Sequence, residues 1–324
     1  MSEPMNMRSD TLLRRPAADG RERCEIVVGV DGTAANWSAV SWAAAEARAT
    51  GCPLRLVAAS TWADTPACAP RTENLEREHL ERLTRDLLDD VRSRVSRTAG
   101  QVSTCVATGE PVHALLAAAA PDDVLVLGKR GGHPLSRMVL GSTSMAVAGR
   151  CRGLVVVVPE GWSIGEYRGN PIVAGIDGDR DRQVLDFAFA RSQRLGVPLV
   201  VVHASHPSGH QALSTGDAPR SSSDALNELA ATVAPWQRRH PAVSVRFASH
   251  PLTPTVALLG AATDAQLLVL GRRTGAQHLG GLGLASTTRK VLHHAPCPVV
   301  VVPESELEAH FPDSAALDEE DVRQ

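Results

Sequence analysis

Short apolar runs alternate along the chain with longer segments of helical periodicity. The first run, residues 26–30, is β-branched and unbroken, as expected for a strand that is buried on both faces. A helical segment follows from about residue 34 to residue 50, where Gly51 is suited to end a helix and Pro53 follows. Strands separated by helices are typical of right-handed βαβ units around a parallel sheet.

The next 110 residues continue this alternation. Strands are expected over 54–59, 102–107, 124–127 and 154–158, and helices over 71–97, over 112–120 and from Ser142 onward. The helix over 71–97 has apolar residues along one side and many Arg and Glu residues on an expected solvated face. Five strands with helices between them predict a doubly wound α/β domain.

The pattern then occurs a second time, in the same order. The segment "IVVGVDG" at 26–32 returns as "IVAGIDG" at 172–178, and "VVVVP" at 155–159 returns at 299–303. We therefore expect two tandem doubly wound domains, each a five-stranded parallel sheet with helices on both faces. The expected organisation is a disordered tail over 1–20, domain 1 over 21–160, a linker over 161–170, domain 2 over 171–303 and an acidic tail over 304–324.

Bulk composition excludes several classes of protein. The chain has 324 residues and a formal net charge of −3, which does not favour binding to nucleic acid or to an anionic membrane. No apolar run approaches the ~20 residues of a spanning helix, and the first residues lack the apolar core of a signal peptide, so we expect a cytoplasmic protein. The six cysteines form no CxxC pair and no histidine cluster has zinc-ligand spacing, so no metal site is expected.

The glycine-rich segment "LVLGKRGGHPLSRMVLGS" at 125–142 carries the candidate chemistry. Ligands of doubly wound sheets bind at the carboxyl ends of the strands, where Gly128 and Asp31 both lie. Glycines let backbone N–H groups approach a phosphate, and the helix from Ser142 offers free N–H groups and a favourable dipole. Further positive charge is available from Lys129, Arg130 and Arg137. Strand, glycine loop and helix N-terminus together predict a phosphate-binding site.

The standard phosphate motifs GxxxxGK[ST] and GxGxxG are absent. The spacing Gly128-x2-Gly131-x9-Gly141-Ser142 instead resembles the nucleotide signature of the universal stress protein family. The Asp after the first strand, the closing "VVVVP" and "RKVLHHAPCPVVVVP" at 289–303 are also similar to that family. The resemblance covers about 24–159 and 170–303, and it fits the tandem form of the family with ATP bound in the first domain.

This resemblance implies ATP, accompanied by Mg²⁺, at the carboxyl edge of domain 1. By position, Asp31 would contact the adenine and ribose side, and backbone near Ala58 or Ala59 would touch the base. The glycines and the start of the helix would hold the ribose and phosphates. The expected binding residues are Val30, Asp31, Ala58, Ala59, Gly128, Lys129, Gly131, Gly141, Ser142 and Thr143. Structural alternatives remain open: Asp31 as a helix cap, Gly141-Ser142 as a plain helix start, and Lys129 as a solvent-facing cation.

Domain 2 departs from the pattern. Gly271 is kept, but Thr274 and Ala285 stand where the second and third glycines are expected. A methyl group at a position of close backbone approach blocks or displaces a phosphate, so nucleotide binding is not expected there unless Gly275 or Gly283 substitutes through a shift of the loop. Asp177 would then serve only as a helix cap.

The resemblance implies an ATP-binding, nucleotide-responsive regulator in stress response, with an unknown protein partner. Two alternatives stay open: a slow ATPase or nucleotidyl- or phosphoryl-transfer enzyme on the same fold, and a protein-binding scaffold that does not depend on nucleotide. No general base stands near the glycines, so no catalytic residue is expected. The last strand of each domain is wholly apolar, which predicts that the two domains pair as an intramolecular pseudo-dimer, with homodimerisation as a further option.

Overall fold

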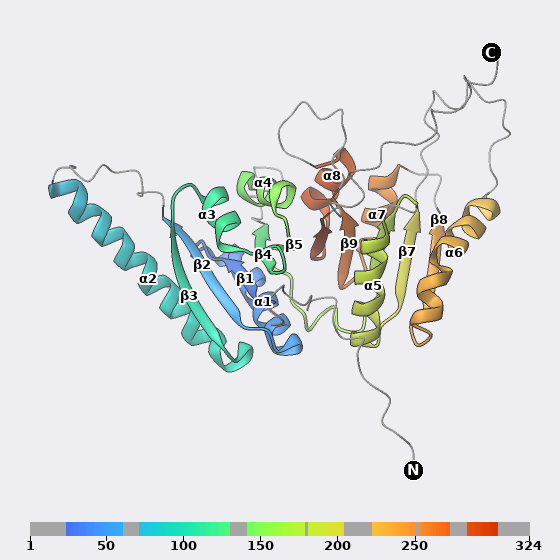
Figure 1. Cartoon of the computed structure of the whole chain (residues 1–324), viewed down its shortest axis with the longest axis horizontal. Coiled ribbons are helices and arrows are strands. Elements are labelled where there is room, and N and C mark those ends of the chain that lie inside the picture. Colours follow the sequence, from blue (N-terminus) through green and yellow to red (C-terminus); the bar gives the residue numbers. More distant parts are fainter. Residues whose placement is uncertain are drawn as a thin grey trace, which may run out of the picture.

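The computed structural model describes residues 24–60, 71–129, 141–178, 181–203, 222–249, 253–272 and 284–303. Strands and helices alternate throughout these residues, as the apolar pattern predicts (Figure 1). The strands of domain 1 are β1 (Ile26–Gly29), β2 (Leu54–Ser60), β3 (Val102–Thr108), β4 (Val124–Lys129) and β5 (Leu154–Pro159). Its helices are α1 (Trp37–Thr50), α2 (Arg71–Ala99), α3 (Pro111–Ala118) and α4 (Ser142–Arg150). The 3₁₀ turn η1 (Ala34–Asn36) directly precedes α1.

Domain 2 repeats this order of elements. Its strands are β6 (Ile172–Ile176), β7 (Leu199–His203), β8 (Val245–Ser249), β9 (Leu267–Gly271) and β10 (Val299–Val302). Its helices are α5 (Arg182–Leu195), α6 (Ser222–Arg239), α7 (Pro254–Ala262) and α8 (Ser286–His294). The first helix of each domain ends at a glycine in the left-handed region, Gly51 with φ 71° and Gly196 with φ 65°, because glycine has no Cβ to oppose that conformation.

The two half-sheets join into one ten-stranded sheet with the order β3-β2-β1-β4-β5-β10-β9-β6-β7-β8. The strands of each half pair in parallel, whereas β5 and β10 pair antiparallel at the seam between the domains. At this seam Val300 stands opposite Val156, and these two residues occupy the same place in the two repeats. The pairing leaves neither of these apolar strands as an open edge.

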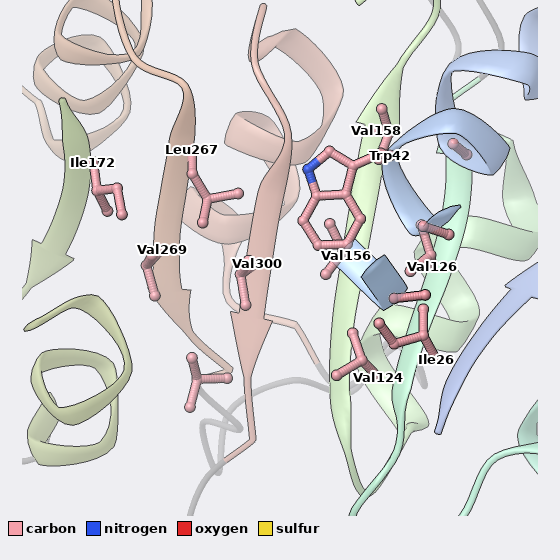
Figure 2. Close-up of a cluster of buried hydrophobic side chains, with 14 of the residues drawn as sticks. Ile26, Trp42, Val124, Val126, Val156, Val158, Ile172, Leu267, Val269 and Val300 are labelled. Atoms are coloured by element: carbon pink, nitrogen blue, oxygen red, sulfur yellow. The ribbon is translucent and has the colours of Figure 1, made fainter. Parts of the chain in front are cut away.

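Two hydrophobic cores run across the seam, one on each face of the sheet. On one face, α1, α2, α5 and α6 cover a core that includes Val156, Val158 and Val300 (Figure 2). On the other face, α3, α4, α7 and α8 cover a core that includes Val155 and Val157. Because alternate valines of β5 and β10 point to opposite faces, each seam strand contributes to both cores. Burial on both faces therefore stabilises the pairing of the domains.

A buried ion pair also joins the domains. Glu46 of α1 is 4% exposed and lies against Arg191 of α5, which is 9% exposed. The same carboxylate accepts a hydrogen bond from Arg194 at 2.7 Å. The Arg191 guanidinium also lies 6.0 Å from the centroid of the Trp42 ring, a cation–π distance. One carboxylate of domain 1 is thus held by two cations of domain 2.

The segment between the domains packs against the fold. Trp162 is buried within the core that lies under α1 and α5, and its ring stacks on Tyr167 with centroids 6.0 Å apart. The expected linker 161–170 therefore contributes apolar contacts to the joint between the domains. None of the helices in the described ranges has the length and hydrophobicity that crossing a membrane requires.

Glu46→Ala should lower the free energy of unfolding by ~3–5 kcal/mol, because it leaves Arg191 buried without its counter-charge. Denaturant unfolding followed by circular dichroism measures the loss. The matched control is Asp89→Ala, which removes an exposed ion pair with Arg92 on α2 and should cost less than about 1 kcal/mol. Equal stabilities of the two variants would contradict the importance of the interdomain pair.

Candidate functional site

The carboxyl ends of β1, β2 and β4 meet at one edge of the sheet. β1 lies between β2 and β4, and the strand order reverses between β1 and β4, which is the topological switch point. Val30 follows β1 at this edge, and its N–H donates to the carbonyl of Val57 at 2.7 Å. Ala58, which is buried, and Ala59, which is half-buried, lie near the end of β2. The fold thus gathers the expected base-contacting backbone at the switch point.

Asp31 is exposed at the same edge. One of its carboxylate oxygens, Oδ1, accepts hydrogen bonds from the N–H and the hydroxyl of Thr33, at 2.9 and 2.7 Å. These bonds close the turn between β1 and η1, whose N-cap residue is Thr33. The turn fixes the direction of the Asp31 side chain, and contact with adenine and ribose remains a prediction.

Gly128 lies where β4 passes closest to the start of the first helix. A Cβ built on Gly128 would lie 3.1 Å from Nδ2 and 3.3 Å from Cα of Asn36. Asn36 is buried, and its amide donates to the carbonyl of Gly29 at 2.9 Å. The carbonyl of Gly128 accepts a hydrogen bond from Ser144 of α4 at 3.0 Å. A side chain at this position would therefore press on Asn36, and hydrogen bonds attach the surroundings of Gly128 to β1 and α4.

Asn36 and Ser144 were missed in the sequence interpretation, although both are positioned to shape this edge. Polar residues are common in the first turn of a helix, so the sequence alone does not mark either residue as functional. The repeat offers a signal: Thr288 takes the place of Ser144 in domain 2, and its hydroxyl lies 3.5 Å from the carbonyl of Gly271. A hydroxyl at this position of both domains indicates a shared contact from helix to strand.

Gly141 is the N-cap residue of α4. Its φ of −56° and ψ of 140° are accessible to any residue, so its conformation does not require glycine. A Cβ built on Gly141 would have no atom of the described residues within 4 Å. Ser142 is exposed and Thr143 half-buried, and the first amides of a helix have no partner within it. As far as the described residues go, the start of α4 therefore presents backbone donors with no side chain packed against them.

The start of α3 shows the contrast. There the carboxylate of Glu110 accepts hydrogen bonds from the N–H groups of Val112 and His113. That helix is capped by an anion of the chain itself. Gly141 has no side chain with which to cap α4, so an external anion could take the corresponding place.

Lys129 is buried and contacts the other domain. Its ammonium donates to the carbonyl of Ala295, at the end of α8, at 3.3 Å. Burial lowers the pKa of Lys129 to about 8. The side chain is therefore not solvent-facing, and a direct phosphate contact remains a prediction. Gly131, Arg130 and Arg137 lie outside the described residues.

The corresponding edge of domain 2 carries a carboxylate. A Cβ built on Gly271 would lie 3.0 Å from Oδ1 of Asp181, so Asp181 occupies the place that Asn36 has in domain 1. Its Oδ2 accepts the N–H of Asp177 at 2.6 Å. Ala285 is the N-cap residue of α8, where domain 1 has Gly141, and Thr274 lies outside the described residues. A buried carboxyl group and a methyl group thus stand where domain 1 has the amide of Asn36 and the bare backbone of Gly141.

The family model for the universal stress protein family matches residues 24–159 and 170–303. The chain belongs to the universal stress protein family. A universal stress protein of Mycolicibacterium smegmatis is 31% identical over 294 residues, covering 86% of this chain and 96% of the relative. One from Mycobacterium tuberculosis is 30% identical over 303 residues, covering 85% and 94%. The tandem arrangement of two domains is thus shared with these relatives over almost their whole length.

Solved structures agree on the fold of this universal stress protein. The crystal structure of a universal stress protein from Archaeoglobus fulgidus superposes with a TM-score of 0.66 at 16% identity, covering 87% of this chain and 98% of the other. A Pseudomonas aeruginosa protein described as functionally unknown gives a TM-score of 0.60 at 16% identity, covering 88% and 94%. At such identities the likeness concerns the fold alone.

Gly128→Val should destabilise the fold by ~1–3 kcal/mol, because the added side chain would overlap Asn36. Gly141→Ser is the control: its Cβ would meet no atom of the described residues and serine is a preferred N-cap, so stability should stay equal or rise by a few tenths of a kcal/mol. Denaturant unfolding of both variants measures the difference. A Gly128→Val chain as stable as the parent would show that the close approach of Gly128 to Asn36 is not a packing constraint.

Proposed function

We propose that this universal stress protein binds ATP at the carboxyl edge of domain 1 and acts as a nucleotide-responsive regulator in stress response. One observation carries the proposal: at the start of α4, on the edge where β1, β2 and β4 end, Gly141 has no capping side chain and its Cβ would have no atom of the described residues within 4 Å. A helix N-terminus at a topological switch point offers backbone donors and a favourable dipole to a phosphate group.

The residues of domain 1 fit such a ligand. The triphosphate would lie against the amides of Ser142 and Thr143, with Gly128 and Gly131 giving backbone access, and Mg²⁺ would accompany it. The base would lie against the backbone at Ala58 and Ala59. Asp31, which is exposed and held by Thr33, would contact the ribose and adenine.

Regulation is favoured over turnover by the chemistry at this edge. Of the described residues expected at the site, Asp31 alone is acidic, and it already accepts two hydrogen bonds from Thr33. A transfer enzyme needs a positioned acid, base or nucleophile beside the phosphates. The edge offers backbone amides and hydroxyls, which are groups suited to holding a nucleotide. A steady-state ATPase assay beside a binding titration distinguishes the two functions.

The chain should bind one ATP, not two. The edge of domain 2 presents the buried carboxylate of Asp181 beside Gly271 and the methyl group of Ala285 at the start of α8, and both disfavour a triphosphate. Isothermal titration calorimetry of the whole chain with Mg-ATP measures the stoichiometry. Two sites of equal affinity per chain would contradict the assignment of the site to domain 1.

Gly141→Val should weaken ATP binding by ~100-fold or more. The β-branched side chain would occupy the proposed phosphate position at the start of α4 and remove two or three charge-assisted hydrogen bonds, each worth roughly 1.5–3 kcal/mol. The fold should persist, since the backbone angles of Gly141 suit any residue and its Cβ meets no described atom.

The matched control for Gly141→Val is Ala285→Val, which makes the same change at the start of α8 and should leave ATP affinity unchanged. Calorimetry measures both affinities, and circular dichroism checks the fold. A Gly141→Val chain that is folded and binds ATP like the parent would show that the start of α4 is not the phosphate site.

A further inference from the structure

In each domain a basic residue directly follows the glycine near the end of the fourth strand, and its side chain contacts the other domain. Lys129 follows Gly128, and its ammonium donates to the carbonyl of Ala295 in domain 2. Arg272 follows Gly271, and its guanidinium donates to the carbonyl of Cys151 in domain 1. Cys151 and Ala295 occupy the same place in the two repeats, since they end α4 and α8. The contacts are therefore a symmetric pair about the seam.

Each acceptor is a helix C-terminus. The last carbonyls of a helix have no partner within it and carry its negative dipole end, so a cation is favoured there. Ala295 is buried, as is Lys129, and no carboxylate of the described residues forms an ion pair with the ammonium. Within the described part of the chain, the end of α8 therefore supplies the hydrogen-bond acceptor for the Lys129 ammonium.

The last residues of β4 pair with the sheet on one side only, where the register with β5 continues to Lys129. The pairing of β4 with β1 extends only to Val126, opposite Val28. On its other side, Lys129 stands opposite Pro159 of β5, which has no N–H to donate. The Lys129 side chain thus supplies an attachment where the backbone pairing of β4 ends, one residue after Gly128.

We propose that domain 2 serves as a positioning element for the site of domain 1: the C-terminus of α8 holds Lys129 and thereby fixes the backbone at Gly128 for ligand binding. This inference rests on the proposed nucleotide site. It assigns Lys129 the role of a positioning residue in place of a phosphate ligand. It also gives domain 2, whose glycine pattern is broken, a part in nucleotide binding.

The surroundings of Lys129 make the contact sensitive to pH. Among the described residues, two ionisable groups interact with it, His293 of α8 and Cys297 just before β10. The pKa of His293 is lowered by burial and by its neighbours His294 and Lys129, and burial raises the pKa of the Cys297 thiol to about 12. The thiol is therefore neutral at physiological pH. The pKa of Lys129, lowered by burial to about 8, places its loss of charge within a range that binding assays reach.

Three variants test the inference. Lys129→Met keeps the length of the side chain and removes the charge, and Lys129→Arg restores a cation, the residue type that domain 2 has at this position. Arg272→Met removes the symmetric contact and serves as the matched control for a general loosening of the seam. Calorimetry with Mg-ATP and with AMP measures affinity, and hydrogen exchange of the nucleotide-free chain reports on residues 125–129.

Lys129→Met should weaken binding of ATP and AMP to the same extent, about tenfold, the value of one hydrogen bond to a charged group. It should also speed amide exchange at the end of β4 without nucleotide. Lys129→Arg should restore both properties, and Arg272→Met should change neither. The parent's affinity should fall as pH rises through about 8, because the ammonium loses its proton, and Lys129→Arg should abolish that step.

Several outcomes would overturn the inference. A loss that is much larger for ATP than for AMP would show direct phosphate contact by Lys129. An equal loss in Arg272→Met would show a general effect of the seam, and unchanged exchange in Lys129→Met would show that the contact fixes nothing. A parent chain that binds neither nucleotide would overturn the proposed function itself, whereas the exchange experiment would still report whether Lys129 holds the end of β4.

Discussion

The antiparallel pairing of β5 with β10 is the interaction on which the rest of the structure depends. A five-stranded parallel sheet with a wholly apolar last strand has an exposed edge and two cores that end there. Pairing the two last strands satisfies their backbone groups and continues both cores across the seam. It also brings α1 beside α5, and the end of each fourth strand beside the last helix of the other domain. The register of β5 against β10 therefore determines which helices and strand ends of the two domains meet.

Much of the fold could be predicted from the sequence because its signals are local and occur twice. Buried parallel strands have unbroken apolar sequences, so β1, β4 and β5 can be recognised from the sequence. Gly51 likewise marks the end of α1. The repeat fixed the number of domains, and the apolar last strands predicted their pairing. The helix over 71–97 was recognised from its amphipathic pattern and extends to Ala99.

The site could be predicted only in part, because its remaining features depend on tertiary contacts. The pattern placed Asp31, Gly128 and Gly141 at one edge, and the structure gathers them there. It could not show that Gly128 packs against Asn36, because these residues are 92 positions apart in the sequence and only the fold brings them into contact. Nor could it show that Lys129, which reads as a loop cation, is buried against α8. The Asp181 carboxylate beside Gly271 was likewise invisible, because the turn before α5 is one residue shorter than its counterpart in domain 1.

Sequence differences between the two repeats make the contact between the domains asymmetric. Glu46 and Arg191 are each the tenth residue of their helices, α1 and α5, so they occupy the same place in the two domains. In a symmetric dimer of identical domains, residues at such a place near the axis meet their own copies. Two domain 1 copies would then bury Glu46 against Glu46, and two domain 2 copies would bury Arg191 against Arg191. Unpaired like charges in a buried site are strongly unfavourable, so each domain favours the other as its partner. The two domains differ in the same way at their carboxyl edges, where Asp181 and Ala285 of domain 2 stand in the places of Asn36 and Gly141, and this difference supports the proposal that domain 1 binds the phosphate.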